Sequence, residues 1–82
     1  MEPRIIEAKY LKEYQVRLKF SDGTIGVVDL KNDLEGQVFK PLKKIDYFKT
    51  FQLHPDLHTL TWPNGADFSP EFLYRTGKRA AA

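Results

Sequence analysis

Apolar and polar side chains alternate most regularly between residues 14 and 20. The apolar members of this stretch share one face of an extended chain: Tyr14, Val16, Leu18 and Phe20. A period of two is typical of a strand that buries one face and exposes the other. The pattern therefore predicts a half-buried strand over residues 14–20.

A tight turn follows this strand. Asp22 and Gly23 supply the positive φ angles that a two-residue hairpin turn requires, so the chain is expected to return as a second strand over residues 25–30. In that register Phe20 lies opposite Ile25, and both side chains point to the buried face. The two strands form the first predicted hairpin.

Three further apolar runs predict strands. Residues 5–11 form an N-terminal strand with partial alternation, and residues 51–54 and 59–62 alternate again on either side of a four-residue loop. The last two strands form a second hairpin. The sequence thus predicts an antiparallel meander sheet made of two hairpins and an N-terminal strand.

Two helices are expected outside the sheet. Pro41 suits the first turn of a helix, and the apolar residues after it recur at a spacing of three, namely Leu42, Ile45 and Phe48. This helix should cover one face of the sheet. Ser69 and Pro70 predict the start of a short C-terminal helix that ends at Gly77. The fold class is therefore α+β.

Composition narrows the type of protein. The chain has 82 residues, no cysteine and a net charge of +2. This length favours a single domain, which we place at residues 1–79, with residues 80–82 as a disordered tail. The absence of cysteine fits a reducing compartment, and no apolar run is long enough for a membrane span, so we expect a cytoplasmic protein without a membrane partner.

The corner at residues 62–67, Trp-Pro-Asn-Gly-Ala-Asp, contains the only tryptophan. Pro63 ends the preceding strand, and Asn64-Gly65 redirects the chain. The structural interpretation is that Trp62 anchors the last strand to the helix. The competing interpretation is a partner-binding surface, because tryptophan is enriched at the centres of protein interfaces. Its candidate residues are Trp62, Asn64, Asp67 and Tyr74.

These residues also carry a family resemblance. Phe20-x-Asp22-Gly23, Val28-Asp29-Leu30, the corner, Ser69-Pro70-Glu71 and Leu73-Tyr74 resemble the bacterial family known as domain of unknown function twenty-four forty-two. The resemblance covers about residues 3–76 and implies a small α+β domain with a meander sheet. It also implies a partner, because many members are encoded beside another small protein in what looks like a toxin and antitoxin pair. Some members carry a helix-turn-helix domain, which these 82 residues lack.

Basic residues suggest a second type of partner. Lys43, Lys44 and Lys49 lie on the predicted helix, and a basic C-terminal end follows the last helix, comprising Arg75, Lys78 and Arg79. Such groups neutralise phosphates, so the alternative function is a regulatory protein that contacts DNA through this end. The other interpretation is an ordinary solvated surface.

Metal binding and catalysis have weaker support. His54, Asp56 and His58 offer two imidazoles and a carboxylate, but the loop that carries them bends at Pro55 and gives no spacing to another ligand. Asp22, Asp29 and Asp67 have turn, cap and loop roles that explain them without catalysis. We therefore assign no catalytic residue, metal ligand or cofactor, and leave a metal-dependent enzyme as a minor alternative.

The sequence thus favours a non-catalytic protein-interaction module. Its expected partner is another small protein, encoded by an adjacent gene and related to this chain as a toxin is to its antitoxin. A sheet edge also offers main-chain hydrogen bonds to a second copy, so a homo-oligomer is a further expectation.

Overall fold

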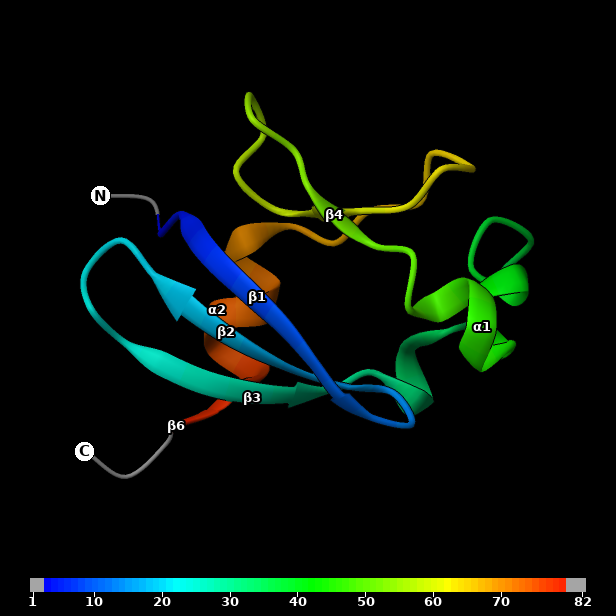
Figure 1. The fold of residues 1–82 in the computed structure, drawn as a ribbon, viewed down its shortest axis with the longest axis horizontal. Helices are drawn as coiled ribbons and strands as arrows, with labels where there is room; N and C mark the ends of the chain where they lie inside the picture. Colours follow the sequence, from blue (N-terminus) through cyan, green and yellow to red (C-terminus); the bar gives the residue numbers. More distant parts are fainter. Residues whose placement is uncertain (1–2, 80–82) are drawn as a thin grey trace.

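The computed structural model describes residues 3–79 and has one main antiparallel sheet. Its strand order is β1-β2-β3-β6, with β1 at Ile5–Lys12, β2 at Gln15–Phe20, β3 at Ile25–Asp29 and β6 at Lys78–Arg79. The first three strands form an antiparallel meander, the part of the predicted sheet that comprises the N-terminal strand and the first hairpin (Figure 1). Residues 80–82, where we expected a disordered tail, lie outside the described residues.

A second, two-stranded sheet pairs β4 (Gln52–Leu53) with β5 (Leu60–Thr61). Leu53 lies opposite Leu60, and the His54 amide donates to the carbonyl of Thr59 at 2.9 Å. This confirms the second hairpin and its four-residue loop. In Figure 1 the hairpin lies above the main sheet.

The inner face of the main sheet is covered by α2 (Pro70–Thr76), which lies behind the strands in Figure 1. The Ser69 hydroxyl accepts a hydrogen bond from the Phe72 amide at 3.1 Å, which confirms the predicted cap. Leu73 is completely buried on the sheet. The chain is therefore α+β, and the helix that covers the sheet is α2, whereas the sequence assigned that position to the helix predicted from Pro41.

One core lies between the main sheet, α2 and the smaller hairpin. Apolar residues in all of these elements are almost fully buried in it: Ile5, Val16, Leu18, Phe20, Val28, Leu30, Leu34, Leu42, Phe48, Leu60, Trp62, Ala66, Phe68 and Leu73. Large aromatic rings contribute much of this burial, which is how a short chain closes a core.

The first hairpin has a different register from the predicted one. Lys19, not Phe20, lies opposite Ile25, because the turn contains three residues, with Gly23 at a φ of +88°. The shift turns Gly26 and Val28 to the core and leaves Ile25 half-buried. Asp22 stabilises the longer turn by accepting from the Thr24 amide at 2.9 Å.

The helix predicted from Pro41 is also wrong in its extent. The structure has a short 3₁₀ turn, η2 (Lys40–Lys43), and a single α-helical turn, α1 (Ile45–Phe48). Lys44 separates them in an extended conformation, with ψ at 121°. Leu42 and Phe48 are buried as predicted, whereas Ile45 is 38% exposed. A second 3₁₀ turn, η1 (Lys31–Asp33), follows β3.

The main sheet has different strands at its two edges. β6 pairs with β3 through Lys78 and Arg79, a strand that the sequence pattern did not predict. β1 forms the other edge and has register shifts after Ile5 and after Tyr10. Such irregularities discourage edge-to-edge pairing, and association through this edge stays a prediction.

Candidate functional site

Trp62 lies at the centre of the corner and is buried. Its side chain is 4% exposed, and the indole Nε1 donates to the carbonyl of Phe48 at 2.9 Å. The ring packs against Phe48 and Phe68, with centroid distances of 5.7 and 5.8 Å. This position agrees with the structural interpretation, in which Trp62 joins its strand to the helical segment.

Asn64 makes a second connection to the same part of the chain. Its Nδ2 donates to the carbonyl of Val38 at 2.8 Å, while its Oδ1 accepts from the Ala66 amide at 3.1 Å. Gly65, at a φ of +89°, lets the chain turn back so tightly. Both polar groups of the Asn64 side chain are therefore used inside the protein.

Tyr14 makes the third connection. Its hydroxyl donates to the carbonyl of Lys43, and its ring contacts Phe48 edge to face. In a continuous helix the Lys43 carbonyl would accept from the amide four residues later, but the Tyr47 amide donates to Lys44 instead. We call residues 38–48 the anchored segment, because its carbonyls at Val38, Lys43 and Phe48 each accept from a side chain elsewhere in the fold.

The anchored segment presents a pocket of about 640 Å³ on its outer side. We call it the lysine pocket, and it is lined by Gln37, Lys40, Pro41, Lys43, Lys44 and Tyr47. All of these except the half-buried Tyr47 are exposed. Ring and stem carbons of Pro41, Tyr47 and the lysines give the pocket apolar walls below its charged rim.

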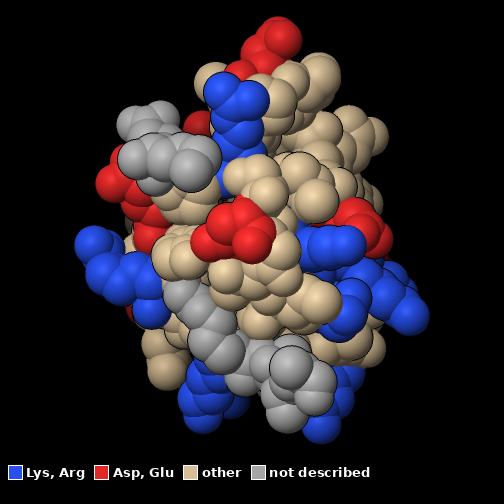
Figure 2. All heavy atoms as spheres, turned by 90° about the vertical axis from the view of Figure 1, so that its left-hand side faces the viewer, with Lys and Arg blue, Asp and Glu red and all other residues tan. Residues whose placement is uncertain are grey.

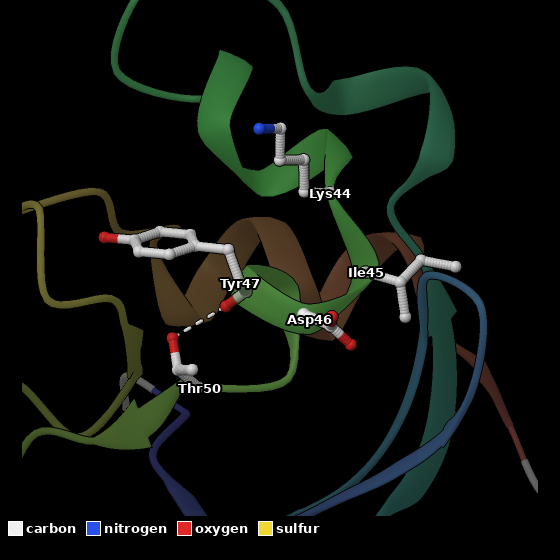
Figure 3. Close-up of a pocket in the computed structure, with 5 residues that line it drawn as sticks. All are labelled: Lys44, Ile45, Asp46, Tyr47 and Thr50. Atoms are coloured by element: carbon white, nitrogen blue, oxygen red, sulfur yellow. Dashed lines mark hydrogen bonds between the residues drawn. The ribbon is translucent and has the colours of Figure 1, made fainter.

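A neighbouring pocket of about 570 Å³ shares Lys44 and Tyr47 with the lysine pocket. Figure 3 shows its lining, in which Tyr47 and Ile45 point to opposite sides of α1. The Thr50 hydroxyl donates to the carbonyl of Tyr47 at 2.6 Å. Asp46 adds a carboxylate here, so the positive charge is concentrated in the lysine pocket.

The four partner-binding candidates are not brought together. Asp67 is exposed and forms an isolated bridge with Thr61. Tyr74 lies on α2, where its hydroxyl donates to Oδ2 of Asp22 at 2.7 Å. Trp62 and Asn64 contact the anchored segment at the right-hand end of Figure 1, whereas the β2–β3 turn that holds Asp22 lies at the left-hand end. Their role in binding stays a prediction.

The structure displaces the pKa of Asp22, an exposed carboxyl in the β2–β3 turn. The hydrogen bond from the Tyr74 hydroxyl, followed by bonds from the Thr24 amide and hydroxyl, lowers its pKa below the ordinary value of 3.8. Figure 2 views this end of the molecule, where acidic and basic side chains are interspersed. Asp22 thus connects the turn to α2 within a mixed surface.

The basic C-terminal residues lie partly in the sheet. Arg75 is exposed in the last turn of α2, and Lys78 pairs with Val27 in β6. Val27 itself lies opposite Arg17, and Arg17 opposite Lys9. We call Lys9, Arg17 and Lys78 the basic row, since these exposed cations cross the open face of the sheet in one line. Arg79, which is also in β6, pairs with Gly26 of β3.

The candidate metal and catalytic residues have local roles. Nδ1 of His54 accepts from the amides of Asp56 and Leu57, both at 3.1 Å. Asp29 accepts from the Lys31 amide at 3.0 Å. Within residues 3–79, no three His, Cys, Asp or Glu side chains are grouped as metal ligands. None of the helices in that range has the length and apolar character of a bilayer span.

Sequence reasoning missed the anchored segment as a unit. Lys43 and Lys44 were recognised as basic, but the roles of Tyr14 and Val38 rest on contacts between residues 29 and 26 positions apart. The dense run Lys-Pro-Leu-Lys-Lys at residues 40–44 was the available signal. A regular helix would also place Lys40, Lys43 and Lys44 on one side, so the run indicates a basic surface but not the extended break at Lys44.

Fold and site together define a small α+β domain in which the corner at residues 62–67 contacts a basic surface segment. The chain belongs to the family described as "Protein of unknown function (DUF2442)", whose family model matches residues 5–79. No curated protein and no solved structure matched the chain.

Proposed function

We propose that this protein is a non-catalytic interaction module that binds another small protein through the anchored segment. In this proposal the partner is encoded by an adjacent gene, and the present chain acts on it as an antitoxin acts on its toxin. The observation that carries the proposal is the anchoring of one surface segment at three backbone carbonyls, from Tyr14, Trp62 and Asn64.

Such anchoring favours binding because a prearranged surface loses little conformational freedom when a partner docks. The segment is irregular, and its two short helical turns are hydrogen-bonded separately on either side of the extended Lys44, so no continuous helix fixes their relative positions. Side chains from three other places in the chain supply that support. In this proposal the polar groups of the corner have a structural role, and the anchored segment that they hold in place contacts the partner.

Exposed apolar residues beside the pockets support a protein partner. Within the anchored segment, Val38 is 44% exposed and Ile45 is 38% exposed. Protein interfaces combine apolar contacts of this kind with a polar or charged rim. The three lysines of the lysine pocket lie between these two residues in the chain and supply the charged part.

The test is binding to the purified product of the adjacent gene, measured by isothermal titration calorimetry. Ile45→Asp should weaken the complex by about tenfold or more if the segment lies in the interface. Leu57→Asp is the matched control, because Leu57 is 53% exposed on the β4–β5 loop and should change affinity by less than about twofold. Equal losses in both variants, or no complex at all, would refute the proposal.

DNA contact is the second candidate function, and the basic row favours it. Lys9 and Arg17 lie directly opposite each other, and like charges in that position destabilise a sheet unless an anion neutralises them. In a salt-dependent DNA mobility assay, K9Q/R17Q should reduce binding if this surface contacts phosphates. Removing residues after Gly77 is a poor test, because it deletes β6 from the sheet.

A further inference from the structure

The charges around the lysine pocket are poorly balanced by the protein itself. Lys40, Lys43 and Lys44 come from one short stretch, and no described carboxylate forms an ion pair with any of them. The ion pair recorded within residues 3–79 is elsewhere, between Nζ of Lys19 and Oε2 of Glu7 at 3.8 Å. Three neighbouring ammonium groups repel one another, so an anion in the pocket gains favourable interactions with all three.

From this arrangement we infer that the lysine pocket binds an acidic segment of the partner protein, with carboxylates at the lysines and an apolar side chain between them. The inference rests on the proposed function and specifies the chemistry of its partner. Complementary charge at the edge of an interface accelerates association and selects among partners. The neighbouring carboxylate of Asp46 lies in the adjoining pocket and limits how far the acidic segment extends.

The apolar walls of the pocket determine the rest of the ligand. Pro41 and Tyr47 present ring carbons beside the lysine stems, and such surfaces accept an aliphatic or aromatic side chain. A bare phosphate would leave this surface exposed to water. A polypeptide that places Leu or Phe beside Glu or Asp covers both parts of the pocket.

The shape of the pocket favours a polypeptide over nucleic acid. Its three lysines line a hollow of about 640 Å³, whereas a nucleic-acid backbone presents phosphates in a line. The basic row across the open sheet face is the arrangement that suits such a line. The described residues therefore form two basic surfaces with three defined cations each, the lysine pocket and the basic row, and each is a control for the other.

The experiment uses the full chain and a fluorescent peptide of about 15 residues that repeats Glu-Glu-Leu, with binding followed by anisotropy and by amide chemical shifts. A peptide that repeats Lys-Lys-Leu controls for charge, and a duplex DNA of about 20 base pairs tests the other polymer. K40Q/K43Q/K44Q should weaken binding of the acidic peptide by about tenfold or more. K9Q/R17Q/K78Q removes the same charge from the basic row and should change the affinity for the acidic peptide by less than about twofold.

The expected result is that the Glu-Glu-Leu peptide shifts amides of residues 37–50 and that the Lys-Lys-Leu peptide does not. The inference is overturned if the two triple variants lose affinity equally, if the acidic peptide does not bind, or if DNA competes for the same amides more strongly. A binding assay with the adjacent gene product distinguishes failure of the acidic-ligand inference from failure of the proposed function. If that protein binds the K40Q/K43Q/K44Q variant normally, the interaction module stands and the acidic ligand does not.

Discussion

The main sheet and the anchored segment are stabilised in different ways. β1, β2 and β3 are joined by ladders of main-chain hydrogen bonds, which any side chain of suitable shape permits. The anchored segment depends on three particular side chains that donate to its carbonyls. Substitution of one of these three side chains can therefore loosen the whole anchored segment, whereas one substitution in the sheet changes mainly the local packing.

This difference explains why polar residues of the corner need not lie in an active site. A buried carbonyl without a donor costs about 1–3 kcal/mol, so the side chain that supplies the donor is restricted to few residue types. Trp62 meets that requirement for the buried carbonyl of Phe48. Asn64 acts at an exposed position, where one side chain bonds both the Val38 carbonyl and the Ala66 amide. Structural roles therefore account for both residues.

Trp62→Ala should have the largest effect, because it removes an anchor and a core side chain together. Loss of the ring costs about 3–5 kcal/mol of unfolding free energy, a large part of the stability of a small domain. Urea denaturation followed by circular dichroism measures the change. Trp62→Phe keeps most of the packing and isolates the hydrogen bond, with an expected cost of about 1–2 kcal/mol. A cost below about 1 kcal/mol for the alanine variant would show that the ring is not part of the core.

Gly77→Ala tests the sheet side of the comparison. A methyl group there would lie 3.0 Å from the Leu73 carbonyl oxygen and 3.2 Å from Cγ1 of Val28. We expect a net loss of about 1–3 kcal/mol from crowding, measured by thermal unfolding. Amide exchange should increase around β6 and leave the anchored segment unchanged. Unaltered stability would mean that α2 and β3 separate easily to admit the methyl group.

Tyr14→Phe should have a smaller effect on stability and a local effect on structure. The ring keeps its contact with Phe48, but the Lys43 carbonyl loses its donor. The expected cost is about 0.5–1.5 kcal/mol. In amide-exchange experiments the protection of α1 should fall below its wild-type level, while the protection of β2 should stay the same. Equal protection in variant and wild type would remove Tyr14 from the set of anchors.

Tyr74→Phe removes the hydrogen bond from the Tyr74 hydroxyl to Asp22 and should have the smallest effect on stability. Folding lowers the pKa of Asp22, so its carboxylate adds stability above the unfolded pKa near 3.8, and this contribution disappears as pH falls through the folded pKa. Carboxyl NMR titration of the variant should show the Asp22 pKa moved up towards 3.8. The difference in melting temperature between variant and wild type should shrink below that pH. A pKa that does not move would assign the displacement to Thr24 instead.

Local patterns in the sequence were sufficient for much of the fold. Alternation located β2, and the loop length fixed the second hairpin with Leu53 opposite Leu60. Ser69 and Pro70 together marked the start of α2. These features depend on neighbouring residues, so a short window of sequence contains the information.

Other features depended on contacts that no local pattern encodes. An Asp-Gly pair is compatible with turns of two or three residues, and the choice of three shifted the register of Ile25. β6 has only two residues and forms because Gly77 brings the chain against β3. The helix is broken at Lys44, next to the carbonyl of Lys43 that accepts from the distant Tyr14. This long-range contact, and with it the shape of the lysine pocket, could not be read from a local pattern.

Amide hydrogen exchange in Asn64→Ala tests the central claim most directly. Asn64 contacts the anchored segment through Val38, and its removal leaves the sheet ladders intact. If the corner holds the segment in place, exchange should accelerate across residues 38–48 while β2 and β3 keep wild-type protection. Unchanged exchange in the segment, or an equal increase across the sheet, would contradict the account.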